Sequence, residues 1–133
     1  MSNDVACAVL FAKADRARLS ALALLYMGDV DGACNRAYYA MVDAARAALL
    51  ASGAPVQPGI AKTHSGLLNA FSEHLIKNGR LAKDMGRLLK RAEEMRLIAD
   101  YKGDPIELSD AREMVEQSDL FVSAIMAKFM PSD

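Results

Sequence analysis

The sequence of 133 residues has few of the features that build metal sites, disulfides or membrane spans. Its two cysteines, Cys7 and Cys34, are far apart and belong to no Cys-x-x-Cys or Cys-x-His cluster, so neither a zinc site nor a disulfide framework is indicated. No apolar run approaches the roughly 18 residues of a membrane span, and no basic segment precedes the short apolar run near the N-terminus. We therefore expect a cytoplasmic protein with no metal, cofactor or membrane anchor.

The chain also lacks an excess of charge of one sign. Sixteen Lys and Arg against seventeen Asp and Glu give a net charge of −1, which argues against a protein whose whole surface holds nucleic acid. The charge is uneven, because residues 62–103 carry nine basic and five acidic groups. Four of these basic residues lie in a segment, about residues 81–101, that we predict to be a helix, and they face mostly away from its apolar side: Lys83, Arg87, Lys90 and Arg91. A solvated helix face is the ordinary interpretation, and a local basic patch is the alternative.

The usual enzyme motifs are missing as well. The sequence has no glycine-rich phosphate loop, no GxSxG, no HExxH and no DxDxDG pattern.

What the sequence does have is helical periodicity throughout, with 53% hydrophobic residues. Turn-forming residues divide it into five segments, and Thr63 and Ser109 are predicted to cap the third and fifth. The predicted helices cover about residues 4–27, 29–52, 63–77, 81–101 and 109–130. Short connections favour antiparallel neighbours. We predict one all-α domain over residues 1–133, an up-and-down four-helix bundle with an additional helix.

Polar and aromatic residues gather in three short segments near the predicted helix ends. The residues that could form a site are Arg36, Tyr39, Lys62, His64, Arg96, Asp100 and Tyr101. Lys62 and His64 come at the positive N-terminus of the third helix, which attracts phosphate or carboxylate. Arg36 and Tyr39 share a helix face that is neither fully apolar nor fully polar.

Each segment also has a purely structural interpretation. Tyr38 and Tyr39 fit the edge of a core, with Tyr38 more fully inside it, because Tyr38 aligns with Met41. His64 could bond a backbone carbonyl in a capping loop. Arg96 and Asp100 are four residues apart, which predicts an intrahelical ion pair of only about 0.3–0.5 kcal/mol if it is exposed.

Taken together, three motifs resemble the HEPN superfamily of small helical proteins. They are Ala-x-x-Arg-Ala-Tyr-Tyr-Ala-Met at residues 33–41, Lys-Thr-His-Ser-Gly at residues 62–66, and Arg-x-x-x-Asp-Tyr at residues 96–101. The resemblance implies a bundle of four main helices with an extra C-terminal helix, often a homodimer whose cleft gathers polar residues from both copies. It further implies metal-independent ribonucleases that act as toxins or in phage defence, some of them encoded beside a minimal nucleotidyltransferase partner.

The resemblance also implies that nuclease members place a histidine four to six residues after the arginine. Here residues 97–102 contain no histidine, and RNA cleavage needs a base for the 2′-hydroxyl proton and an acid for the leaving oxygen. Our leading hypothesis is a catalytically degenerate HEPN module that binds a nucleotide, RNA or a nucleotidyltransferase-fold partner. In it Arg96 contacts phosphate and Tyr101 supplies a stacking surface or hydrogen bond. The alternatives are a metal-independent endoribonuclease toxin that uses His64 and Arg96, and a purely structural bundle.

Overall fold

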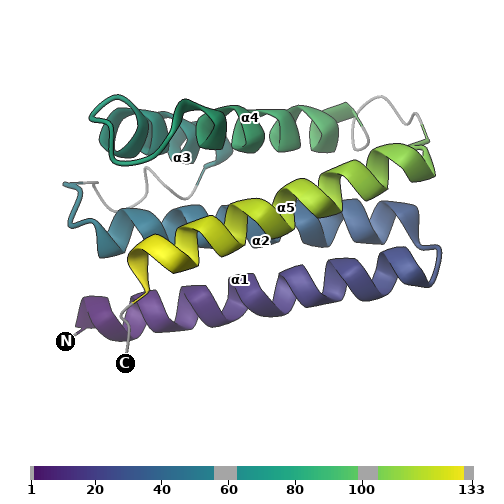
Figure 1. The fold of residues 1–133 in the computed structure, drawn as a ribbon, viewed down its shortest axis with the longest axis horizontal. Helices are drawn as coiled ribbons and strands as arrows, with labels where there is room; N and C mark the ends of the chain where they lie inside the picture. Colours follow the sequence, from purple (N-terminus) through teal and green to yellow (C-terminus); the bar gives the residue numbers. More distant parts are fainter. Residues whose placement is uncertain (1, 56–62, 99–104, 131–133) are drawn as a thin grey trace.

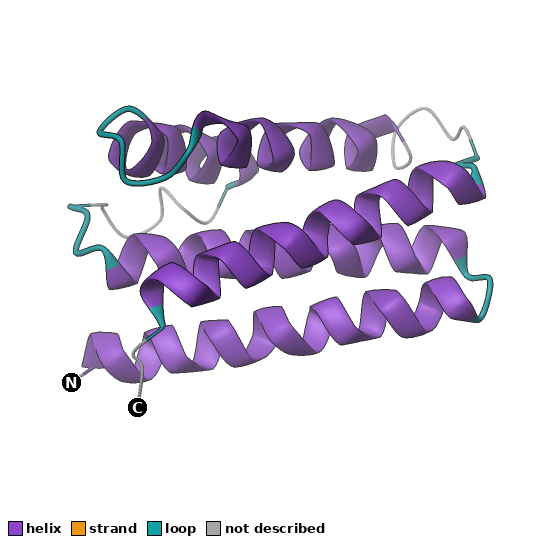
Figure 2. Ribbon diagram, in the orientation of Figure 1, coloured by secondary structure: helices purple, strands orange, loops and turns teal. Residues whose placement is uncertain are grey.

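The computed structural model describes residues 2–55, 63–98 and 105–130, and all the regular structure in these ranges is helical (Figures 1 and 2). The elements are α1 Ser2–Tyr26, α2 Val30–Ala51, α3 His64–Phe71, the π-helical turn η2 Ser72–Ile76, α4 Lys83–Leu97 and α5 Leu108–Phe129. The prediction of an all-α fold is confirmed. No helix in the described ranges is both long and apolar enough to cross a lipid bilayer.

Short polar side chains and glycines set the helix ends. The Asp29 carboxylate accepts a hydrogen bond from the Gly32 N–H at 2.9 Å, and the Thr63 hydroxyl accepts one from the Gly66 N–H at 3.0 Å. Each bond satisfies a backbone donor that the first helical turn leaves free, so both residues are N-caps. Gly28, after α1, has a φ of +86°, a backbone conformation that glycine adopts without strain.

Two details of the predicted helices are wrong. The third predicted helix is not uniform, because α3 ends at Phe71 and residues 72–76 form a wider π turn. Ser109 is not an N-cap, because α5 begins at Leu108, one residue earlier, with Glu107 in the extended capping position. Serine favours both a cap and an exposed place in the first turn, so its presence does not fix the boundary.

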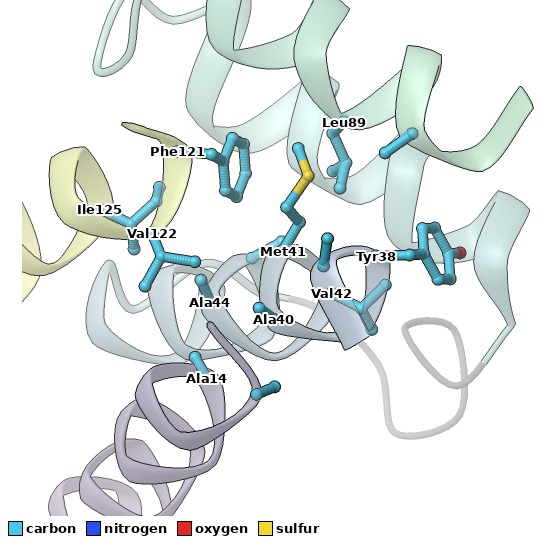
Figure 3. Close-up of a cluster of buried hydrophobic side chains, with 14 of the residues drawn as sticks. Ala14, Tyr38, Ala40, Met41, Val42, Ala44, Leu89, Phe121, Val122 and Ile125 are labelled. Atoms are coloured by element: carbon cyan, nitrogen blue, oxygen red, sulfur yellow. The ribbon is translucent and has the colours of Figure 1, made fainter. Parts of the chain in front are cut away.

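Helix α2 is the centre of the bundle and contacts α1, α3, α4 and α5. In Figure 1, α1 and α4 lie on opposite sides of the layer formed by α2 and α5. Alanines make up much of the buried surface of α2, and Ala14, Ala17 and Ala21 of α1 are fully buried as well. Small side chains let two helix backbones approach closely, which explains the extensive contact between α1 and α2. Larger side chains fill the far side of α2, around Met41 (Figure 3): Leu89, Phe121, Val122 and Ile125.

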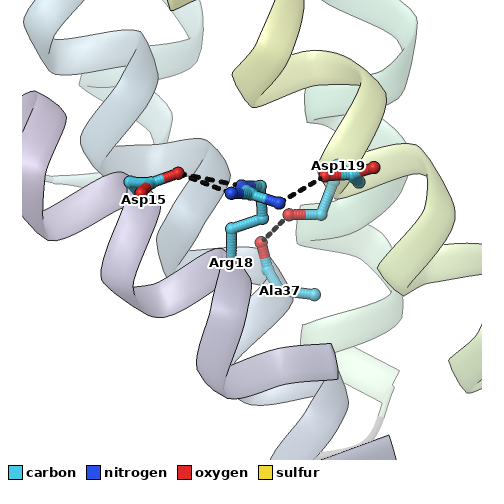
Figure 4. A network of polar contacts seen from close by, with 5 residues as sticks. Asp15, Arg18, Ala37 and Asp119 are labelled. Carbon is cyan, nitrogen blue, oxygen red and sulfur yellow. Dashed lines mark hydrogen bonds and ion pairs between the residues drawn. The ribbon is translucent and has the colours of Figure 1, made fainter. Parts of the chain in front are cut away.

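Polar side-chain contacts connect α5 to α1 and to α2. The Arg18 guanidinium of α1 donates to Asp15 at 2.7 Å and to Asp119 of α5 at 2.9 Å (Figure 4). The buried Ser118 hydroxyl donates to the Ala37 carbonyl of α2 at 2.8 Å. Because a buried hydroxyl needs a partner, this bond fixes where α5 crosses α2.

The close approach of α1 to α2 gives a direct test. We expect Ala14→Leu to lower the free energy of unfolding by roughly 1–3 kcal/mol, because the added carbons have no space at a fully buried position. Ala127→Leu, at an exposed position of α5, is the matched control and should change stability little. Urea unfolding followed by circular dichroism measures both; equal stability of the two variants would contradict the proposed packing.

Candidate functional site

Tyr38 of α2 joins the hydrophobic core to a polar cluster. Its side chain is 2% exposed, as expected for a core residue, and its hydroxyl points away from Met41 (Figure 3). That hydroxyl makes a hydrogen bond with Nδ1 of His64, the first residue of α3. The two ring centroids are 5.2 Å apart. The N-cap at Thr63 sets the start of α3 and so places the imidazole against α2.

Arg96, in the last turn of α4, approaches the same tyrosine from a third helix. Its guanidinium carbon lies 5.2 Å from the Tyr38 ring centroid, within the range of a cation–π interaction. Three helices therefore bring Tyr38, His64 and Arg96 together, and we call these residues the tyrosine cluster.

The protonation of the tyrosine cluster follows from burial and from nearby charges. Burial lowers the pKa of His64, the positive charge of Arg96 lowers it further, Glu93 raises it, and Arg46 lowers it. Burial and then the negative charge of Glu93 raise the pKa of Tyr38 to about 12, although Arg96 acts in the opposite direction. At neutral pH the histidine is uncharged and the tyrosine keeps its proton, so Arg96 carries the positive charge of the cluster.

Arg36 and Tyr39 extend the polar surface along α2. The Arg36 guanidinium carbon is 5.9 Å from the Tyr39 ring centroid. Tyr39 in turn lies beside Tyr38, with ring centroids 5.3 Å apart, and 6.5 Å from the His64 ring. The structure thus connects four of the residues singled out from the sequence through contacts with Tyr38 and Tyr39: Arg36, Tyr39, His64 and Arg96.

The other three sequence candidates, Lys62, Asp100 and Tyr101, lie outside the described residues, and so does the predicted Arg96–Asp100 ion pair.

Sequence reasoning missed two contributors. The sequence placed Tyr38 in the core, and its ring is indeed buried. The sequence did not indicate that the Tyr38 hydroxyl forms a hydrogen bond with His64.

Glu93 was not singled out at all. It is half-buried, and its Oε2 has no hydrogen-bond partner among the described residues. Its spacing of three residues before Arg96 on a helix is the signal that could have identified it. Across the described residues, no three His, Cys, Asp or Glu side chains are grouped as a metal site requires.

The protein is an all-α bundle in which Tyr38 of α2, His64 of α3 and Arg96 of α4 form a polar cluster. The HEPN domain model matches residues 8–128, so the chain belongs to the HEPN domain family.

Named relatives agree with this assignment. The chain is 37% identical over 117 residues to a UPF0332 protein of Gloeobacter violaceus, a match that covers 84% of this chain and 89% of the relative. It is 33% identical over 95 residues to a UPF0332 protein of Thermotoga maritima, covering 70% of this chain and 67% of that one. It is 29% identical over 93 residues to "Putative toxin MJ0605" of Methanocaldococcus jannaschii, covering 70% and 66%.

The charges around His64 predict opposite effects of two substitutions on its titration. Arg96→Gln should raise the pKa of His64, and Glu93→Gln should lower it, because each removes a charge that acts on the imidazole. NMR titration of the imidazole measures both shifts. Arg80→Gln is the control, because Arg80 is bound to the Ser52 carbonyl and should not affect His64.

The same pKa shift makes stability depend on pH. The pKa of His64 is lower in the folded than in the unfolded chain, so the unfolded chain binds the proton more readily. The contribution of His64 to stability is complete above the unfolded value of about 6.5 and is lost as the pH falls through the folded value. His64→Gln should flatten this part of the stability profile; an unchanged profile would contradict the arrangement.

Proposed function

We propose that this chain is a toxin-related HEPN protein whose tyrosine cluster binds the phosphate of a nucleotide or of RNA. The observation that carries the proposal is the convergence of Arg96 and His64 on Tyr38, although the three residues come from separate helices. Arg96 supplies a permanently charged planar donor, the side chain best suited to phosphate. The name of the M. jannaschii relative supports the connection with toxins.

The tautomer of His64 separates binding from cleavage. In the binding proposal the Tyr38 hydroxyl donates to Nδ1 of His64, one of the two directions that this hydrogen bond allows. A neutral imidazole that accepts at Nδ1 carries its proton on Nε2. In that tautomer His64 presents an N–H donor to an anion and has no nitrogen left to act as a base.

A second candidate function is metal-independent RNA cleavage by His64 and Arg96. It is favoured by the same convergence, which brings a histidine and an arginine together without the usual sequence spacing. If Nδ1 were instead the donor to Tyr38, Nε2 would be free to accept the ribose 2′-hydroxyl proton. Arg96 would then offset the negative charge that develops on phosphate.

RNA binding and RNA cleavage are separated by one set of measurements. With labelled single-stranded RNA in EDTA, we expect the wild-type protein to bind and the RNA to stay intact. Arg96→Gln should weaken binding about tenfold or more, because a hydrogen bond to a charged group contributes about 1.5–3 kcal/mol. Arg80→Gln, the control, should bind as the wild type does.

Three outcomes would count against the binding proposal. Cleavage that disappears in His64→Ala and in Arg96→Ala would establish the nuclease instead. Binding unaffected by Arg96→Gln, with only stability changed, would favour the structural interpretation of the cluster. Nitrogen NMR that finds the His64 proton on Nδ1 would remove the argument for a donor at Nε2.

The HEPN assignment also motivates a proposal about assembly. We propose that the chain forms a homodimer through α1, whose outer face repeats small and apolar side chains at spacings of four and three. The positions are Val5, Val9, Ala12, Leu19, Ala23 and Tyr26, with the charged Arg16 between Ala12 and Leu19, and all are exposed. Such a stripe is typical of a helix that packs against another helix. A nucleotidyltransferase-fold protein is the alternative occupant of this face.

Light scattering coupled to gel filtration tests the homodimer. We expect the wild-type protein to have the mass of two chains and Leu19→Glu that of one, because the glutamate would bury a charge in the interface. Leu120→Glu is the matched control, since Leu120 is 66% exposed on α5, away from the stripe. A monomeric wild-type protein would contradict the homodimer and leave the face for a different partner.

A further inference from the structure

A groove between α3–η2 and α4 presents a separate set of side chains from those of the tyrosine cluster. Its volume is about 430 Å³. One wall carries the cations Lys83, Arg87 and Lys90 of α4. The opposite wall carries the neutral polar residues Ser65, Asn69 and Ser72, and the groove is also lined by Leu68, Phe71 and Ile76.

The two walls follow the same helical spacing. Lys83, Arg87 and Lys90 are separated by four and three residues, so their side chains form a row along one face of α4. Ser65, Asn69 and Ser72 have the same spacing on the facing element. Seven residues of helix are about 10 Å long, which matches about three nucleotides of a stacked strand at 3.4 Å each.

The charge in the groove is not cancelled by its other walls. The residues that line it include no Asp or Glu. The Arg87 guanidinium does contact Asp84 at 3.2 Å, but both side chains are more than three-quarters exposed, so this pair is weak. Lys83 and Lys90 have no ion pair with a described residue.

We infer that this groove is a binding site for single-stranded RNA, with the phosphates along α4 and the riboses along α3. A row of cations binds the phosphates of the backbone. Side chains with a hydroxyl or an amide form hydrogen bonds to the ribose 2′-hydroxyl, and apolar side chains contact a base. Ser65 is the neighbour of His64, so the groove runs along another face of the helix that begins in the tyrosine cluster. The inference goes beyond the proposed function and does not depend on phosphate binding by Arg96.

Fluorescence anisotropy with a labelled 12-nucleotide RNA tests the groove in the full chain. The triple variant Lys83→Gln, Arg87→Gln, Lys90→Gln should bind at least about tenfold more weakly and should flatten the slope of log affinity against log salt by about two, since each phosphate contact of a single strand contributes about 0.7. The matched control is Lys13→Gln, Arg112→Gln, Lys128→Gln. It removes the same charge from exposed positions outside the groove and should keep the wild-type slope.

A substitution on the neutral wall separates a shaped site from general attraction. Asn69→Ala keeps all three cations and removes only the amide on the ribose side, so it should also weaken binding, whereas general attraction would leave the affinity unchanged. Equal losses in the groove triple variant and its control would overturn the inference, as would equal affinity for DNA of the same sequence. If Arg96→Gln binds like the wild type while the groove variants fail, the groove stands and the proposal for the tyrosine cluster falls.

Discussion

The close packing of α2 among its neighbours is the constraint on which the rest of the structure depends. Alanines on α2 meet Ala14, Ala17 and Ala21 of α1, so the two backbones come close and α2 is enclosed by the bundle. A helix enclosed in this way can present one side chain to two further helices at once. Tyr38 occupies that position: its ring fills the core, and its hydroxyl reaches the polar cluster of α3 and α4.

The tyrosine cluster brings a histidine and an arginine together from separate helices. No histidine follows Arg96 along α4, yet His64 reaches the same tyrosine from the start of α3. Proximity does not by itself make the histidine a base. Its role depends on which ring nitrogen carries the proton, and the hydrogen bond with Tyr38 is compatible with either tautomer.

The tyrosine cluster, the groove and the proposed dimer face lie on different faces of the bundle. The tyrosine cluster and the cationic groove use different faces of α3, whereas the apolar stripe lies on α1, on the far side of the bundle from α4 (Figure 1). A pair of chains joined through α1 would keep the two tyrosine clusters apart. Each copy would then present its own polar surface to an RNA strand or a partner, unlike a dimer whose cleft is shared.

The sequence by itself determined the helical class, most helix ends and the family, because caps, glycines and apolar periodicity act over a few residues. Thr63 is an example, because it was predicted to cap the third helix and its hydroxyl caps α3. Only the tertiary structure decided that His64 and Arg96 share Tyr38, and that Ser65, Asn69 and Ser72 face the cations of α4. Such contacts join separate helices, and their geometry depends on how closely those helices pack, which no local pattern encodes.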